Sequence, residues 1–360
     1  MTVIAALRLE GIPALIGDFL LTDQRKDLPH FPLPTRPDMS NPVGKPLPHR
    51  IHGMERKCLI INSRFAIGFT GHVPAAKLLF TELENKFGKK SEGPSLIQID
   101  LALKKFKPEI NRRKLDATIV GWTVRSRPRC FSWTAASDSK ASPVNEAIVG
   151  SGATKFRASL SDSSHIGFSE TVANAYERAT LRGINIVGRV LSDELVSGHN
   201  LITGYGYGAE IALFTGTRFA FVPKIGYTFW NIRLDQNGLI SLQSPSKICI
   251  YEDKGRYSLL EIIDSGNRYL AGLTPLHDNM GLILTEDDEP DMICPFYFIG
   301  IAAQDTRTGQ MAMLRLGCMA RDLSLFRIEH SGSGNKYFLH LNMEEVAGFL
   351  RRVFPDARWR

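Results

Sequence analysis

The stretch at residues 2–18, TVIAALRLEGIPALIGD, decides how the chain begins to fold. Its first eight residues, Thr2 to Leu9, are mostly apolar and include β-branched side chains, which favour an extended strand. Gly11 and Pro13 then mark a turn, and a second short strand follows at residues 14–17. The sequence therefore predicts a hairpin at the start of the chain, with Asp18 at the end of the returning strand.

The next segments alternate between a loop, a hairpin and a helix. Residues 23–56 are basic and rich in proline, which predicts a long surface loop inserted into the domain. Residues 57–69 predict a second hairpin with a turn near Asn62. A helix should follow Gly71 directly, because Pro74 suits a first helical turn and apolar residues recur at helical spacing as far as Phe87.

The remainder of the chain predicts strands, then helices, then strands again. Helices are expected at residues 94–107, 170–182 (with Ser169 as N-cap), 184–195 and 343–353, and strands at 115–124, 130–135, 147–149 and, beyond residue 209, as far as about 341. This order predicts an α+β layered fold rather than an alternating parallel one.

Composition excludes several classes of protein. The chain has 360 residues, of which 43% are hydrophobic and 22% charged, so it is expected to fold as a globule of about two domains. Its five cysteines form no CxxC pair, and no run of about 18 uncharged apolar residues occurs, which predicts a cytoplasmic protein without a membrane span or export signal.

No cofactor, metal or nucleic-acid partner is expected either. The net charge of +7 is dispersed, and its short basic clusters lack interleaved aromatic residues. His49 and His52 lie close together in the sequence, but no third residue nearby is spaced to complete a metal site with them. The glycines at 204, 206 and 208 do not form a nucleotide-binding GxGxxG motif.

Thr2 offers a specific kind of chemistry. It follows Met1, and because its side chain is small, a methionine aminopeptidase should remove Met1 and expose the α-amine of Thr2. An N-terminal amine, with an ordinary pKa of about 8, can act as the base for a hydroxyl on the same residue. Thr2 is therefore a candidate nucleophile.

Two spacings and a later motif give the candidate a context. Asp18 lies 16 residues after Thr2, Lys57 lies 14 residues before Gly71, and a Gly-Ser-Gly occurs around Ser151. In these features the sequence resembles the proteasome β-subunits and their bacterial ring-peptidase relatives, which are N-terminal nucleophile hydrolases.

The resemblance implies a role for each catalytic position. Thr2 would be the nucleophile, Lys57 would stand beside its hydroxyl, and Asp18 would hold Lys57 in place. The backbone N–H of Gly71 would form the oxyanion hole, and Ser151 would hydrogen-bond near the amine. Arg56 competes with Lys57 for the position of the lysine, because the proline-rich loop breaks the count from the N-terminus.

Four further positions follow from the same resemblance. In the segment from Ser192 to Gly198, Glu194 would replace the family's aspartate and Ser197 would match its serine. Thr22, four residues after Asp18, and Phe69, just before the glycine of the oxyanion hole, would contact substrate, with the ring of Phe69 shortening the pocket. A core position for Phe69 is the alternative.

The family also implies an architecture and an activity. Residues 1–240 would form a four-layer αββα core carrying the 23–56 insertion, and residues 241–360 a β-rich extension that ends in a helix. The activity would be threonine-type hydrolysis of amide or peptide bonds in a homo-oligomeric ring, with an ATP-dependent unfoldase as a possible partner. The alternatives are an inactive scaffold subunit of the same fold and an amidase that acts on small amides.

Overall fold

The computed structural model describes two compact units of the chain, in residues 2–23, 49–136, 139–163, 174–196, 204–206, 208–254, 257–263, 268–273, 290–320, 326–330 and 337–358. The first unit comprises Met1–Val222 and a short later segment that begins at Leu273, and the second comprises Pro223–Gly272 and Leu284–Arg360. The boundary thus precedes the predicted residue 240, because β13 (Lys224–Leu234) pairs along its length with strands of the second unit.

The first sheet of the first unit is antiparallel and has the strand order β10-β1-β2-β11-β12, comprising β1 (Ile4–Leu9), β2 (Ile12–Asp18), β10 (Ala147–Val149), β11 (Ala209–Phe214) and β12 (Phe219–Phe221). The predicted N-terminal hairpin is confirmed, since β1 pairs with β2 from Ile4 opposite Gly17 to Leu9 opposite Ile12. Asp18 ends β2 as expected.

The second sheet has the order β5-β6-β7-β8-β9, comprising β5 (Cys58–Asn62), β6 (Phe65–Gly71), β7 (Ala117–Val124), β8 (Pro128–Thr134) and β9 (Ser142–Val144). Buried residues from both sheets, among them Ile4, Leu15, Ala66 and Trp122, form one hydrophobic cluster, so the two sheets face each other. Every pairing in this sheet is antiparallel.

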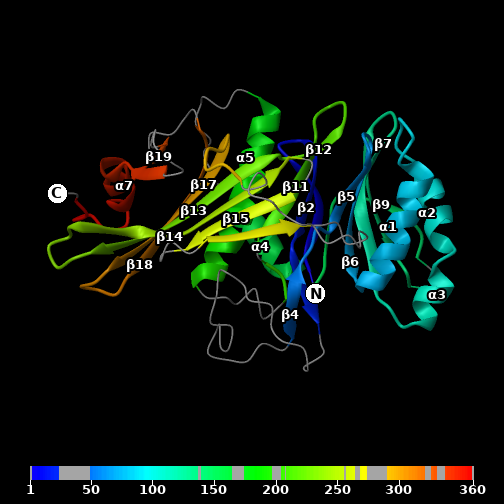
Figure 1. The fold of residues 1–360 in the computed structure, drawn as a ribbon, viewed down its shortest axis with the longest axis horizontal. Helices are drawn as coiled ribbons and strands as arrows, with labels where there is room; N and C mark the ends of the chain where they lie inside the picture. Colours follow the sequence, from blue (N-terminus) through cyan, green and yellow to red (C-terminus); the bar gives the residue numbers. More distant parts are fainter. Residues whose placement is uncertain are drawn as a thin grey trace. The chain divides into compact units, whose positions relative to one another are not determined.

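Three helices cover the outer face of the second sheet, namely α1 (Val73–Phe87), α2 (Leu96–Lys104) and α3 (Lys107–Arg112), and Figure 1 shows them side by side next to β7. The apolar face predicted for α1 is buried and packs with Phe65, Ile67 and Phe69 of β6. The single helix predicted at 94–107 is in fact two, α2 and α3, with the break at residues 105–106.

Two helices pack on the first sheet. They are α4 (Ala153–Ser163), which contacts β10, and α5 (Ala175–Val196), which contacts β1, β2 and β11. The two helices predicted at 170–182 and 184–195 form one continuous helix over their described part, while Ser169 lies outside the described residues. The sequence did not predict α4, because its residues show little apolar periodicity.

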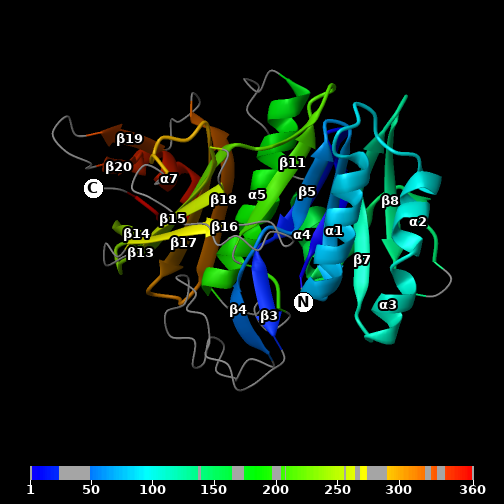
Figure 2. The same ribbon diagram turned by 45° about the vertical axis from the view of Figure 1, so that its right-hand side comes forward.

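The predicted insertion loop begins and ends in a small sheet. β3 (Leu20–Asp23) pairs with β4 (Arg50–Met54), and the two strands lie side by side in Figure 2. The prediction of a loop throughout 23–56 is therefore wrong at both ends, because backbone pairing between β3 and β4 makes them strands. Residues 24–48 lie outside the described part of the chain.

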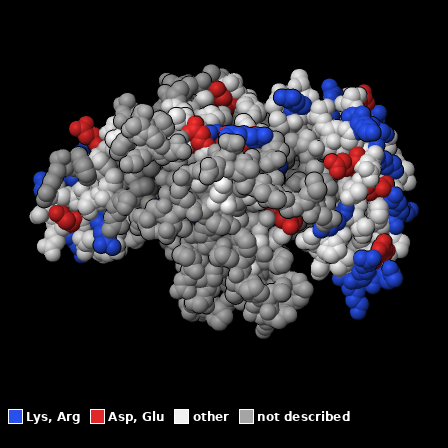
Figure 3. All heavy atoms as spheres, in the orientation of Figure 1, with Lys and Arg blue, Asp and Glu red and all other residues white. Residues whose placement is uncertain are grey.

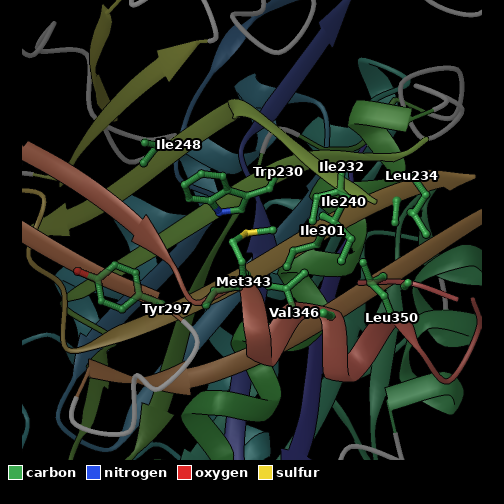
Figure 4. Packing of buried hydrophobic residues seen from close by; sticks show 14 of the residues in the cluster. Trp230, Ile232, Leu234, Ile240, Ile248, Tyr297, Ile301, Met343, Val346 and Leu350 are labelled. Atoms are coloured by element: carbon green, nitrogen blue, oxygen red, sulfur yellow. The ribbon is translucent and has the colours of Figure 1, made fainter. Parts of the chain in front are cut away.

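The second unit is built on a six-stranded sheet with the order β16-β15-β14-β13-β17-β18, comprising β13, β14 (Ile240–Asp253), β15 (Tyr257–Ile263), β16 (Arg268–Leu273), β17 (Phe296–Asp305) and β18 (Met311–Met319). Helix α7 (Met343–Leu350) buries Val346 and Leu350 in a cluster with Trp230 and Ile301 (Figure 4). A two-stranded sheet of β19 (Phe326–His330) and β20 (Tyr337–Leu341) comes directly before α7 in the sequence.

No helix in the described part of the chain is both long enough and apolar enough to cross a membrane.

The packing of α1 on β6 gives a test of the core. Phe80 is fully buried and meets the ring of Phe69 edge to face, with 5.9 Å between centroids. Phe80→Ala should lower the free energy of unfolding by about 3–5 kcal/mol, since it removes a buried ring and leaves a cavity. Ile97→Ala, at a side chain 73% exposed, is the control and should change it by less than about 0.5 kcal/mol. Urea unfolding measures both, and equal effects would contradict the packing.

Candidate active site

Asp18, at the end of β2, accepts the central hydrogen bonds of a buried polar cluster. Its Oδ1 accepts hydrogen bonds from the Thr2 hydroxyl, from the Val3 amide (2.8 Å) and from Lys57 Nζ (2.9 Å). Its Oδ2 accepts one from the Gly206 amide (3.2 Å). A buried carboxylate that accepts from four donors is held in one orientation.

Lys57 lies just before β5 and is almost wholly buried, with 2% of its side chain exposed. The Phe69 amide donates to its carbonyl (3.1 Å), which aligns this part of the chain with β6. Its Nζ donates to Thr2 Oγ1 and to the Leu20 carbonyl, each at 2.6 Å, in addition to Asp18. Burial lowers the pKa of Lys57, while the charge of Asp18 opposes that shift.

Thr2 is held on its other side by the Gly-Ser-Gly segment. Its nitrogen donates to Ser151 Oγ (3.3 Å), and its carbonyl accepts from the Gly152 amide (3.3 Å). Gly150 has φ +100°, and a Cβ on it would lie 2.0 Å from the Thr2 carbonyl oxygen, so only glycine fits there. The segment thus approaches Thr2 closely and presents a hydroxyl to its nitrogen.

The structure therefore brings together Thr2, Asp18, Lys57 and Ser151, which are distant in the sequence. Arg56, the competitor for the lysine position, points elsewhere: its Nε pairs with Glu210 at 2.8 Å, and its guanidinium lies 4.2 Å from the ring centroid of Phe221. The lysine in contact with the Thr2 hydroxyl is Lys57.

Gly71 lies at the end of β6, two residues after the Phe69 amide that bonds to Lys57. Its φ is +134°, and a Cβ there would lie 2.2 Å from the Asp116 carbonyl oxygen, so a side chain is excluded. The role of its N–H as an oxyanion donor stays a prediction, as do the roles of the other site residues.

Glu194 lies two residues before Val196, the last residue of α5. Glu194 is fully buried, and together with Asp18 it adds to the main effect of burial in raising the pKa of Tyr205. The glutamate thus lies near the segment that binds Asp18 through Gly206. Ser197, the next residue after Val196 in the sequence, lies outside the described residues.

The two predicted substrate contacts differ in position. Thr22 is half-buried in β3, opposite Ile51 and two residues beyond the carbonyl that binds Lys57. The ring of Phe69 packs in the hydrophobic cluster between β6 and α1, which is the core position weighed as its alternative. Contact of either residue with substrate stays a prediction.

Glu210 is a member of the site that sequence reasoning missed. This fully buried carboxylate of β11 accepts from the Lys57 amide (2.9 Å), the Cys58 amide (2.7 Å) and Arg56 Nε (2.8 Å). It ties β11 of the first sheet to the start of β5 in the second. The available signal was a single charged residue inside the otherwise apolar strand AEIALF, since charged groups are buried only with partners.

Glu55 adds a second titratable group beside the lysine. Burial raises the pKa of this half-buried carboxyl to about 7, against the opposing charges of Lys77 and Lys57. Its ionisation therefore falls in the neutral range.

The chemistry open to this cluster is that of a hydroxyl activated by its surroundings. A buried ammonium beside an oxygen stabilises the alkoxide form of that oxygen, because few water molecules screen the charge. No group of three or more His, Cys, Asp or Glu side chains among the described residues is placed to hold a metal ion.

Comparisons with known proteins find a similarity among solved structures. No protein-family model matches the sequence, and no curated protein matches it. Among solved structures, the chain is similar to eukaryotic HslV from Trypanosoma brucei, with 18% sequence identity and a TM-score of 0.36 over 59% of this chain and 98% of that one.

The buried carboxylate of Glu210 should matter for stability. Glu210→Gln should lower the free energy of unfolding by about 2–4 kcal/mol, because the buried Arg56 loses its counter-charge. Glu10→Gln is the matched control: Glu10 also pairs with an arginine, Arg182, at 2.8 Å, but both side chains are about one quarter exposed. That change should cost about 1 kcal/mol or less. Chemical unfolding compares the two, and a larger loss for Glu10→Gln would refute the assignment.

The raised pKa of Glu55 predicts a pH dependence. A carboxyl that binds its proton more tightly in the folded state stabilises the fold at low pH, and this contribution is lost as pH rises from about 4.5 to about 7. The unfolding free energy of the wild type minus that of Glu55→Gln should therefore fall over this range. Glu146→Gln, at an exposed carboxyl, controls for loss of one charge. A difference that rises with pH would have the wrong sign.

Proposed function

We propose that the chain is a threonine-type hydrolase of amide bonds, most of all peptide bonds, with Thr2 as its N-terminal nucleophile. The observation that carries the proposal is the 2.6 Å contact between Lys57 Nζ and Thr2 Oγ1 in a site where Lys57 and Thr2 are 2–3% exposed. Burying a lysine is costly unless its charge is paired. Here the pairing with Asp18 leaves the ammonium directed at a hydroxyl.

Catalysis requires cleavage of the peptide bond before Thr2, which turns its nitrogen into an α-amine. The hydroxyl oxygen then attacks the substrate carbonyl carbon while its proton passes to that amine. Lys57 stabilises the attacking oxygen, and the N–H of Gly71 stabilises the negative charge that forms on the substrate carbonyl oxygen. The α-ammonium protonates the leaving amine, and water hydrolyses the resulting threonyl ester. Activity should rise with pH as the amine, with an ordinary pKa of about 8, loses its proton.

The architecture of the first unit supports the same proposal. Two facing sheets, with α1 to α3 on one outer face and α4 and α5 on the other, give the layer order α, β, β, α. We therefore infer a four-layer core of the N-terminal nucleophile type. A homo-oligomeric ring, an ATP-dependent unfoldase as partner and a cytoplasmic location follow from the sequence resemblance and belong to the proposal.

Thr2→Ala provides the main test. It removes the attacking oxygen, so hydrolysis of a fluorogenic peptide should fall by at least about a thousandfold, whereas Thr2→Ser should keep measurable activity. Thr215→Ala, at an exposed turn threonine, is the control and should retain full activity. Wild-type protein should also form a covalent adduct at Thr2 with a threonine-directed inhibitor.

Two results would contradict the proposal or redirect it. An intact bond before Thr2 in the purified protein, seen by mass spectrometry together with no turnover, would favour the scaffold subunit. Turnover of small amides but not of peptides, by a particle of low molecular mass, would favour the amidase.

A further inference from the structure

A cavity of about 500 Å³ lies in the first unit, away from the cluster around Thr2. It is lined by the turn between β7 and β8 and by the residues that lead into α2. Residues 125–129, which form this turn and the first two residues of β8, read R-S-R-P-R. Arg125, Arg127 and Arg129 therefore recur at every second residue, and all three line the cavity. None of its lining residues belongs to the candidate active site.

The positive charge of this cavity is poorly neutralised. Among the described residues that line it, Glu92 is the single carboxylate, and it lies 3.9 Å from Arg125. Among the described residues, Arg127 and Arg129 form no ion pair with a carboxylate. A fourth arginine, Arg64, donates to the Arg125 carbonyl at 3.1 Å and adds its charge nearby. Figure 3 shows several Lys and Arg side chains on the surface of the part of the first unit that carries α1 to α3.

Hydrogen bonds join the two segments that line the cavity, the end of β7 and the residues before α2. Thr123 is buried and donates to the Pro94 carbonyl at 2.6 Å, and the Gly93 amide donates to the Val124 carbonyl at 3.1 Å. The start of α2 is already capped by Ser95 and Gln98 from the same helix. The groups available to bind a ligand here are therefore the arginine side chains, and not the amides at the start of α2.

We propose that this cavity binds a phosphate-bearing small molecule through the guanidinium groups of Arg125, Arg127 and Arg129. Guanidinium groups match phosphate oxygens in charge and in their paired N–H geometry. The volume is that of a small-molecule site. The described residues that line the cavity include no aromatic side chain, so they do not offer the stacking surface of a single-strand nucleic-acid site. The proposal is independent of catalysis at Thr2.

Calorimetric titration of the full chain with sodium tripolyphosphate, at an ionic strength of about 0.15 M, tests the site. We expect saturable binding that Arg127→Ala/Arg129→Ala weakens by about tenfold or more. The control Lys104→Ala/Arg112→Ala removes the same charge from exposed positions outside the cavity and should weaken binding by less than about twofold. Absence of saturable binding, or equal weakening by the two double variants, would overturn the proposal.

A lysine variant and two other ligands complete the test of this site. If the alanine variant does not fold, Arg127→Lys/Arg129→Lys keeps the charge but loses the paired N–H geometry, and unchanged affinity would refute guanidinium recognition. Titration with ATP separates a nucleotide from an inorganic polyphosphate, and tighter binding of either supports the site. Binding of an acidic peptide such as hexaglutamate as tightly as tripolyphosphate, with the same dependence on the arginines, would overturn the phosphate assignment.

Discussion

The buried ion pair between Lys57 and Asp18 is the constraint on which the first unit depends. Each charge would be strongly unfavourable in this environment without the other, and the pair still needs hydrogen bonds for its remaining donors and acceptors. Those come from three separate segments: Thr2 and Val3 before β1, Leu20 at the start of β3, and Gly206 before β11. Satisfying one ion pair therefore fixes the relative positions of several strands.

Glu210 extends the same logic across the two sheets. A strand at the edge of a sheet has unpaired amides, and β5 is such a strand. Glu210 accepts from the amide of Cys58, the first residue of β5, and from the amide of Lys57 just before that strand, and it pairs with Arg56. The charges of Arg56 and Lys57, adjacent in the sequence, thus have different carboxylate partners, and only one of the two reaches the hydroxyl.

The local features of the fold were predictable where a short sequence pattern determines them. The first hairpin, the buried face of α1 and the final helix follow from alternation, helical spacing and turn residues within each segment. The predictions were wrong where partners far away in the sequence decide. β4 forms because β3 pairs with it. The break between α2 and α3 has a local cause instead, because Pro108 in the first turn of α3 has no N–H to continue the hydrogen bonds of α2.

The sequence by itself determined which chemical groups are available: a threonine near the start, an aspartate that closes a strand, a lysine that opens another, and glycines where side chains do not fit. It could not establish which of two neighbouring basic residues faces the threonine, nor that Glu210 anchors them. Only the tertiary structure decided these points, because burial, distance and the pairing of charges depend on segments separated by as many as 188 residues, as for Asp18 and Gly206.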